Sequence, residues 1–512
     1  MNLSLKGKVG DVLTLLAGSA LTLSLAPFNW IWLPPLLLTA FLLLIQQQTL
    51  ARARWHCFLF GLGFLGTGAS WVYVSIYDYT STPAAFAVFL TFAFVAIMAA
   101  VFAMPLCLWN QILQKAKSQQ SKQWVLLLGF PAIWVLDEWY RSWFMTGFAW
   151  LYIGYSQTES YLGGWAPLIS VYGISFWLAL MASSIVFAWN TKRHIWLPIA
   201  IIACAVGGGK ILDRFEWTSP VAGTTQSVAL IQGNVAQEEK WVPEQLQAIR
   251  TLYRNMSMPF WKTGQLVIWP EAAIPDLYTQ EKPFFNALNQ DIADKQGALI
   301  LGVPSLHKSE QGQNILYNSL LGMGGAHGFY HKRRLVPFGE YVPLQHWLED
   351  LLDFFKLPMS EFSLGPDQQA DLYTGKLYAA GSICYEITYP ELIAKQARDA
   401  DFLLTVSNDS WFGHSIGPHQ HMQMAQMRAR ENARELVRAT SNGISAFVDY
   451  RGHIVSQTPQ FVATTLQGDV QARRGITPYQ RWGNAPILFI CFGLLVFALG
   501  ISRFCSFKRS VK

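Results

Sequence analysis

The chain has few charged residues for its length. Only 14% of its 512 residues are Asp, Glu, Lys or Arg, whereas 52% are hydrophobic. Soluble domains usually carry about 25% charged residues. The composition therefore argues against a simply soluble protein, and it directs attention to long apolar segments.

Apolar stretches near the length of a bilayer crossing recur through the first 212 residues and appear once more near the C-terminal end. We predict eight membrane-spanning helices, at residues 11–28, 30–46, 57–77, 84–109, 124–140, 165–189, 195–212 and 485–502. The fifth is the weakest, because Asp137 and Glu138 interrupt its apolar core. This pattern predicts a seven-span bundle over 1–212, a globular domain over 213–482, and a C-terminal helix and tail over 483–512.

Basic residues cluster between the predicted spans in a way that sets their orientation. The clusters contain Lys6, Lys8, Arg52, Arg54, Lys115, Lys117, Lys122, Lys192, Arg193, Arg503, Lys508, Arg509 and Lys512. With eight spans, all of them fall on one side, which the positive-inside rule makes the cytoplasm. We therefore expect both termini in the cytoplasm and residues 213–482 outside it. The net charge of +6 then needs no nucleic-acid partner. A cleaved signal peptide in place of the first span is the less favoured alternative.

Cysteine is also scarce, with six residues in the chain. Four lie in predicted spans and one in the tail, namely Cys57, Cys107, Cys204, Cys491 and Cys505. Cys384 is thus alone in the predicted extracytoplasmic domain, where disulfides would otherwise form. A lone thiol there is either buried as a structural residue or used for chemistry.

The globular region alternates between strand and helix patterns. We predict strands at 227–234, 265–276, 298–303, 401–409 and 443–450, helices at 243–256 and 418–438, and a hairpin within 318–343 around two glycines. Cys384 comes at the end of another apolar run, "LYAAGSI". Such alternation predicts an α/β domain, in which polar site residues gather at strand ends.

Three of these strand ends carry residues that could work together. Glu271 follows one strand, Lys332 another and Cys384 a third. A thiol with a pKa near about 8.5 needs a base to react at neutral pH, which Glu271 could supply, while Lys332 could stabilise an oxyanion. Glu and Lys are common on protein surfaces. Their position in the sequence alone therefore leaves open that Glu271 and Lys332 are ordinary solvent-exposed residues.

The sequence motifs that contain these three residues favour a reactive cluster over exposed surface residues. "WPEAAIPD", "YHKRRLVPFGEYVP", "GSICYEI" and "LLTVSNDSWFG", in this order, resemble the nitrilase superfamily. With its spans, the whole chain resembles the membrane-bound branch of that superfamily, the N-acyltransferases of bacterial lipoprotein maturation. The resemblance implies an αββα sandwich in which Glu271 is the general base, Lys332 the oxyanion-stabilising residue and Cys384 the nucleophile.

Further positions match the family pattern. Glu340 matches a second essential glutamate, Tyr385 and Glu386 match the residues that follow the nucleophile, and Trp241 matches a substrate-side tryptophan. The resemblance implies transfer of an sn-1 acyl chain from a phospholipid of the phosphatidylethanolamine type, through a Cys384 thioester, to the α-amino group of a diacylglyceryl-cysteine on an apolipoprotein. It implies a bacterial inner-membrane enzyme without a cofactor, metal or nucleic-acid partner.

An aromatic segment, 141–157, lies on the predicted outer side. We expect Trp143, Phe144, Phe148 and Trp150 to face lipid, as an interfacial belt with or without a role in substrate binding. Two other functions stay open from the residues alone. One is a membrane-tethered amidase that hydrolyses a small amide, and the other is a transporter that retains an inactive nitrilase-like domain, although the spans hold few of the charges that transport favours.

Overall fold

The computed structural model describes residues 7–79, 82–308, 311–341 and 362–504. It contains two compact units. The first comprises residues 1–73, 82–216 and 481–512, and the second comprises residues 74–81 and 217–480. Each unit is described below by itself. Lys6, Cys505, Lys508, Arg509 and Lys512, as well as the end of the predicted hairpin at 342–343, lie outside the described residues.

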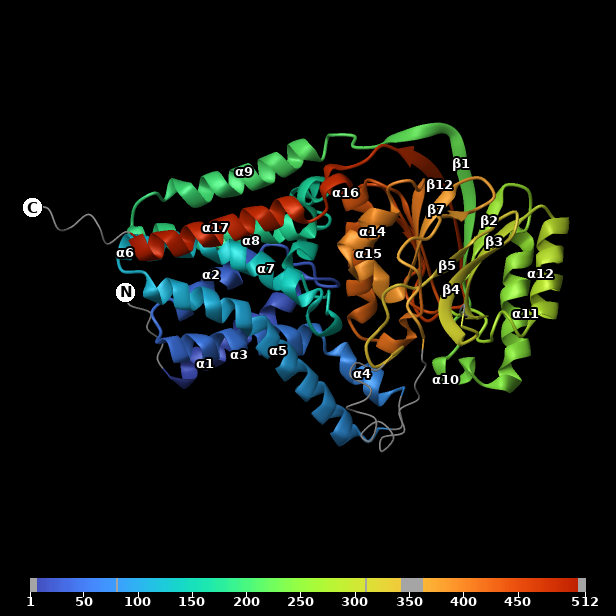
Figure 1. The fold of residues 1–512 in the computed structure, drawn as a ribbon, viewed down its shortest axis with the longest axis horizontal. Helices are drawn as coiled ribbons and strands as arrows, with labels where there is room; N and C mark the ends of the chain where they lie inside the picture. Colours follow the sequence, from blue (N-terminus) through green and yellow to red (C-terminus); the bar gives the residue numbers. More distant parts are fainter. Residues whose placement is uncertain (1–6, 80–81, 309–310, 342–361, 505–512) are drawn as a thin grey trace, which may run out of the picture. The chain divides into compact units, whose positions relative to one another are not determined.

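The first unit is helical (Figure 1). Its principal helices are α1 (Lys8–Leu21), α2 (Leu33–Ile45), α3 (Leu50–Gly68), α5 (Ala84–Lys115), α6 (Gln119–Trp124), α7 (Phe130–Arg141), α8 (Ala166–Thr191), α9 (Trp196–Leu212) and α17 (Ala485–Phe504). Helix α4 (Trp71–Tyr77) carries the chain from this unit into residues 74–81 of the second. Helices therefore occupy all eight predicted ranges.

Not all of these helices are long enough to cross a bilayer. Three described segments meet the length and hydropathy required, at Ala84–Lys115, Tyr161–Thr191 and Ala485–Arg503. Helices α3 and α4, bent by 57°, make a fourth if they count as one span. Helices α1 and α2 have only 14 and 13 residues, and at 1.5 Å per residue each is shorter than the roughly 30 Å hydrocarbon core. A membrane-type helical unit is supported, whereas the count of eight spans is not confirmed.

Helices α1 and α3 pack closely because glycines face each other's backbone. A Cβ atom at Gly18 of α1 would collide with the carbonyl oxygen of Phe60, and one at Gly63 of α3 would collide with that of Leu15. Small residues at such contacts let apolar helices approach closely and gain van der Waals energy. This gain matters most in a bilayer, because lipid is as apolar as the helices and no hydrophobic effect drives the helices together.

The second unit contains two six-stranded sheets. One has the order β12-β1-β2-β3-β4-β5 and the other β11-β10-β9-β8-β7-β6. Their strands are β1 (Ser219–Gln232), β2 (Gln265–Ile268), β3 (Ala298–Lys308), β4 (Asn314–Gly324), β5 (Phe329–His331), β6 (Leu372–Tyr373), β7 (Tyr378–Ile383), β8 (Phe402–Ser407), β9 (Leu436–Thr440), β10 (Ala446–Val448), β11 (Ile454–Gln457) and β12 (Thr464–Arg474). Within each sheet the three central strands, β1-β2-β3 and β7-β8-β9, run parallel.

Helices cover the outer faces of both sheets (Figure 1). One sheet is covered by α11 (Leu246–Ser257) and α12 (Lys282–Asp294), and the other by α14 (Pro390–Gln396) and α15 (Gly417–Asn432). Alternate residues of each strand face opposite ways. Thus Val228 and Leu230 enter the core between the sheets, while Ala229 and Ile231 pack against the helical layer. The expected αββα sandwich is confirmed.

Several element bounds differ from the sequence prediction. The helix predicted over 418–438 ends at Asn432, and β9 follows at Leu436–Thr440. Ala433 takes the left-handed conformation (φ +47°), which ends the helix. The strand predicted at 265–276 is only β2, because Pro270 and Pro275 cannot donate ladder hydrogen bonds. The hairpin around Gly324 and Gly325 is formed by β4 and β5.

Candidate active site

Three strand ends bring the expected reactive residues together. Glu271 lies just after β2, Lys332 directly after β5, and Cys384 directly after β7. The Lys332 Nζ atom lies 3.3 Å from Glu271 Oε1, and the charges of both residues act on the Cys384 thiol. The two sheets therefore contribute to one cluster, with Glu271 and Lys332 from the first and Cys384 from the second.

Lys332 is held between two carboxylates. Its ammonium lies 2.8 Å from Glu340 Oε1 as well as 3.3 Å from Glu271 Oε1, and its side chain is 1% exposed. Asn318 joins the same group, because its Nδ2 donates to Glu271 Oε1 (2.8 Å) and to Glu340 Oε1 (3.0 Å). The backbone N–H of Val336 donates to the other Glu340 oxygen. Glu340 thus positions the lysine that Glu271 also binds.

Glu271 receives further contacts that sequence reasoning missed. The backbone N–H of Asn408, one residue after β8, donates to Glu271 Oε2 (2.8 Å), and the buried Lys240 donates to the Glu271 backbone oxygen (3.1 Å). Desolvation lowers the pKa of Lys240 to about 8. Asn408 lies near the end of the strand predicted at 401–409, so the search for polar residues at strand ends could have found it. Lys240 does not lie at the end of a predicted strand.

These contacts set the charge states of Glu271 and Lys332. Burial acts to raise the pKa of Glu271, but the Lys332 ammonium, the Asn318 amide, Lys240 and the Asn408 N–H together hold it below its usual value. Burial acts to lower the pKa of Lys332, but Glu271 and Glu340 hold it above its usual value. At neutral pH the cluster is therefore an ionised carboxylate beside a permanent ammonium.

Cys384 is a protonated thiol at rest. It is half-buried and takes a left-handed backbone conformation (φ +51°) as the chain leaves β7. Desolvation and the Glu271 carboxylate raise its pKa well above the usual value, and Lys332 offsets this only in part. A standing thiolate is therefore disfavoured. Such a thiol needs a base to react, and the ionised Glu271 carboxylate belongs to the same cluster.

The turn after Cys384 is built around Glu386, which is fully buried. Its carboxylate accepts from the Tyr330 hydroxyl (2.8 and 2.9 Å), from the Arg333 N–H (2.6 Å) and from the Ile383 N–H (2.8 Å). These bonds tie the turn after β7 to the segment that carries Lys332. Tyr385 is 7% exposed and contacts the ring of Tyr389. Both residues therefore lie at the site, where Glu386 acts by holding backbone.

A second buried network lies behind Cys384, and sequence reasoning missed it. The His421 Nε2 atom lies 3.1 Å from the Cys384 carbonyl oxygen, and its Nδ1 lies 3.0 Å from Asp409 Oδ1. Arg438 pairs with the other Asp409 oxygen (2.8 Å). His421 and Asp409 hold the backbone of Cys384 in its left-handed conformation. His414 lies instead at the surface, where its ring contacts that of Phe461.

Trp241 follows α10 (Gln237–Lys240) and is 52% exposed. Its neighbour Lys240 points the other way, into the protein, toward Glu271. The tryptophan is thus next in sequence to a residue that contacts the cluster, while its own ring is available to a substrate.

The aromatic segment of the helical unit differs from expectation. Trp143 is 52% exposed, but Phe148 and Trp150 are buried, and Trp150 packs against Trp71 with ring centroids 5.0 Å apart. Arg141 Nη1 donates to the Trp150 carbonyl (3.1 Å) and so ties the segment to α7. The lipid-facing prediction is wrong for Phe148 and Trp150. Phe144 is half-buried and stacks on Tyr140.

Comparison with known proteins covers both units. Residues 17–184 match the apolipoprotein N-acyltransferase N-terminal domain, and residues 227–479 match the carbon-nitrogen hydrolase family. An apolipoprotein N-acyltransferase of Pseudomonas paraeruginosa is 42% identical over 501 residues, covering 97% of each chain. One of Vibrio parahaemolyticus is 37% identical, covering 92% of this chain and 93% of its own. A solved CN-hydrolase superfamily protein of Xanthomonas campestris aligns with 48% of this chain and 90% of its own at 18% identity and a TM-score of 0.36. The chain belongs to the apolipoprotein N-acyltransferase family.

Proposed function

We propose that the protein transfers an acyl chain from the sn-1 position of a phospholipid to the α-amino group of the diacylglyceryl-cysteine of an apolipoprotein. The observation that carries this proposal is the pairing of a thiol with an ionised Glu271 and a buried Lys332 ammonium, in a chain of an acyltransferase family. Cys384 is the proposed nucleophile, Glu271 the base and Lys332 the oxyanion-stabilising residue.

In the first half-reaction, the Cys384 sulfur attacks the ester carbonyl carbon while Glu271 accepts the thiol proton. The new C–S bond leaves a negative oxygen, which the Lys332 ammonium stabilises. The ester C–O bond then breaks, and Glu271 returns its proton to the departing alcohol oxygen. The products are a lysophospholipid and a Cys384 thioester, so protons and charges balance.

In the second half-reaction, the neutral α-amine of the acceptor attacks the thioester carbon. Glu271 accepts a proton from the nitrogen, Lys332 again stabilises the oxyanion, and the C–S bond breaks. The Cys384 sulfur takes the proton back, which yields an amide and a free thiol. Glu340 and Asn318 keep Lys332 in place through both steps, since they hold it and Glu271 by direct contacts.

Family membership favours the transferase over a membrane-tethered amidase, because the curated relatives that match over nearly the full chain are named acyltransferases. The apolar helices suit a membrane protein. We propose an inner-membrane location with both termini cytoplasmic, residues 213–482 on the periplasmic side, and donors of the phosphatidylethanolamine type. Membrane anchoring supports this function, since it raises the effective concentration of two lipid-bound substrates.

The decisive test is formation of the thioester with donor alone. Purified protein mixed with phospholipid vesicles and rapidly quenched should gain the mass of one acyl chain at Cys384, and hydroxylamine should remove it. Cys384→Ala should show no adduct, while Cys204→Ala, which removes an exposed cysteine of the helical unit, should react normally. Transfer to acceptor by a wild-type protein that never becomes acylated would rule out the covalent route.

A further inference from the structure

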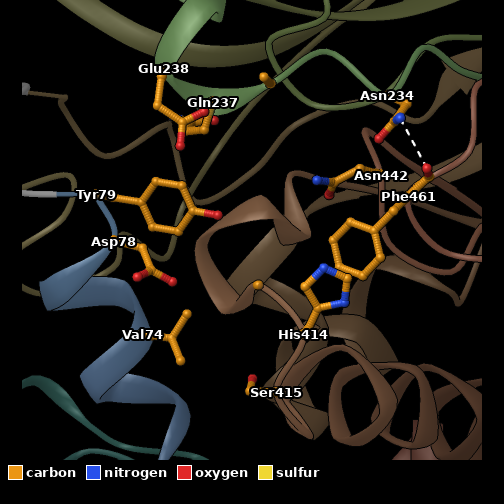
Figure 2. Close-up of a pocket in the computed structure, with 12 residues that line it drawn as sticks. Val74, Asp78, Tyr79, Asn234, Gln237, Glu238, His414, Ser415, Asn442 and Phe461 are labelled. Atoms are coloured by element: carbon orange, nitrogen blue, oxygen red, sulfur yellow. Dashed lines mark hydrogen bonds between the residues drawn. The ribbon is translucent and has the colours of Figure 1, made fainter.

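A cavity of about 660 Å³ lies within the second unit, apart from the reactive cluster. Its walls come from five separate segments of that unit, and the residues that line it include Asp78, Tyr79, Glu238, His414, Asn442 and Phe461. Figure 2 shows these side chains around the open space. Its volume is within the range typical of small-molecule sites.

The cavity is lined by negative charge. Asp78 and Glu238 are both exposed, and neither has an ion-pair partner among the residues that the structure describes. Figure 2 shows their carboxylates on two sides of the Tyr79 ring. Burial, and then the charges of Glu238 and Asp78, raise the pKa of the Tyr79 phenol. Two carboxylates therefore act on one point of the cavity, which favours a cation there.

Asn442 provides an independent indication of a ligand. It is only 8% exposed, and its Oδ1 atom is buried without a hydrogen-bond partner in the described part of the chain. In Figure 2 its amide points into the cavity, toward the side occupied by Tyr79. A buried polar atom left unpaired costs roughly 1–3 kcal/mol. A ligand that donates an N–H would remove that cost.

The opposite wall is aromatic. The His414 ring lies against that of Phe461, with centroids 3.9 Å apart and planes tilted by 33°. Asn234 fixes this part of the wall by donating to the Phe461 carbonyl (3.0 Å). Aromatic faces attract ammonium groups. Carboxylates, an unpaired amide oxygen and aromatic rings together form a site for a group that is cationic and rich in N–H donors.

The cavity also connects with the catalytic residues. Gln237 lines it and accepts from the Asn408 side chain (2.8 Å), and the Asn408 backbone N–H donates to Glu271 (2.8 Å). Two hydrogen bonds therefore separate the wall of the cavity from the proposed base. A substrate bound here would extend toward the same strand ends that carry the chemistry.

We infer that this cavity binds the primary ammonium group of a substrate, held by Asp78 and Glu238 and by the Asn442 amide oxygen. This inference rests on the proposed function, in which the ethanolamine headgroup of the donor phospholipid carries such a group. The acceptor N-terminus is not a ligand of this cavity, because it must reach the Cys384 thioester as a neutral amine.

The test compares wild-type protein with the double variant Asp78→Asn/Glu238→Gln, which removes both charges and keeps the shapes. Glu239→Gln is the matched control, because Glu239 is exposed on the same short helix but does not line the cavity. Thioester formation is measured with phosphatidylethanolamine and with phosphatidylglycerol vesicles of identical acyl chains. Transfer from preformed thioester to a diacylglyceryl-cysteinyl peptide is measured separately.

If the headgroup ammonium binds here, the ratio of the phosphatidylethanolamine rate to the phosphatidylglycerol rate should fall about tenfold or more in the double variant, because losing even one charge-assisted contact has about this effect. An unchanged ratio together with a rise in the half-saturating peptide concentration would overturn the inference, because it would mean that the cavity acts on the acceptor and not on the donor headgroup. The inference is overturned if the double variant matches Glu239→Gln in both measurements. Absence of thioester in wild-type protein would instead defeat the proposed function.

Discussion

Both units of the protein bury an ion pair, and the two pairs differ in what surrounds them. In the helical unit, Asp137 and Arg141 lie 3.0 Å apart on successive turns of α7, each 1% exposed. Arg141 also donates to the Trp150 carbonyl. In the α/β unit, Lys332 lies between Glu271 and Glu340. The first pair holds backbone, and the second has a thiol beside it.

The difference shows what converts a buried charge pair into a reactive site. The pair in α7 comes from one helix, so its members are neighbours by local geometry alone. Glu271 and Lys332 come from segments 61 residues apart, and both act on Cys384 from the other sheet. Only the sandwich brings them together, at strand ends where backbone N–H groups can also contribute. The charges of α7 are therefore expected to matter for stability, and those at the strand ends for rate.

Glu271→Gln should give the largest effect on rate. The substitution keeps the shape but removes the proposed general base, and such a group typically contributes about 10²–10⁴ in rate. The rate of thioester formation, measured by rapid quench, should fall by that factor while the protein remains folded. Glu239→Gln is the control, because it removes an exposed carboxylate from the same unit. A near-normal rate in Glu271→Gln would show that another group activates Cys384.

Lys332→Ala should give the next largest effect. Loss of a donor to the oxyanion typically costs about 10²–10³ in rate. The variant also leaves Glu271 without the ammonium that lowers its pKa, so the acid side of the pH–rate profile should move upward. The two effects separate in one experiment, in which acylation is followed at several pH values. Loss of rate without a shift of the profile would mean that Lys332 does not act on Glu271.

Asp137→Asn should affect stability instead. It leaves the Arg141 guanidinium buried without its partner, and breaking such a pair costs about 3–5 kcal/mol. Thermal unfolding in a membrane mimic should shift to lower temperature, while the folded fraction still forms the thioester. Replacing both residues, with Arg141→Met added, should recover part of the loss. If thioester formation were abolished while the unfolding temperature stayed the same, the α7 ion pair would act on rate and not on stability, contrary to the comparison between the two units.

Much of the fold could be predicted from the sequence, because apolar length and alternation are local signals. The helical ranges, the β4–β5 hairpin and the strand ends at Glu271 and Cys384 followed from these patterns. The end of α15 did not, because an alanine rather than a glycine takes the left-handed position. The apolar run alone could not distinguish β9 from a continuing helix.

The site was predictable in part for a similar reason. The reactive residues fall in recognisable motifs, whereas Asn318 and Lys240 act through contacts that only the folded chain creates. Burial of Trp150 was also invisible in sequence, because it comes with tertiary contacts such as ring packing against Trp71 and the Arg141 hydrogen bond to its carbonyl. Tertiary contacts of common polar residues leave no periodic signal.

Lys240→Met should give the smallest effect on the rate of thioester formation. This variant measures how much the Lys240 charge contributes to the low pKa of Glu271. The Lys240 ammonium contributes to the low pKa of Glu271. Glu271 acts as a base only when ionised, so the acylation rate should be flat through neutral pH and fall as pH drops through the depressed pKa of Glu271. Removing Lys240 should move this acid limb to higher pH by less than Lys332→Ala does, since Lys332 is the larger electrostatic influence. The pH–rate profile of thioester formation measures the shift.

The control for this last comparison is Lys262→Met, which removes an exposed lysine of the same unit. At neutral pH all three proteins should react at similar rates, because Glu271 stays ionised while Lys332 remains in contact. The substitution also removes a cation whose own pKa is lowered to about 8 by burial. Below that pH the native protein keeps a costly buried charge, so Lys240→Met should unfold at higher temperature than wild type at pH 6 and lose this advantage as Lys240 deprotonates. Two results together would contradict this expectation: an acid limb of the pH–rate profile that does not move, and a difference in unfolding temperature that does not change with pH. They would mean that Lys240 supports Glu271 only through its hydrogen bond to the backbone.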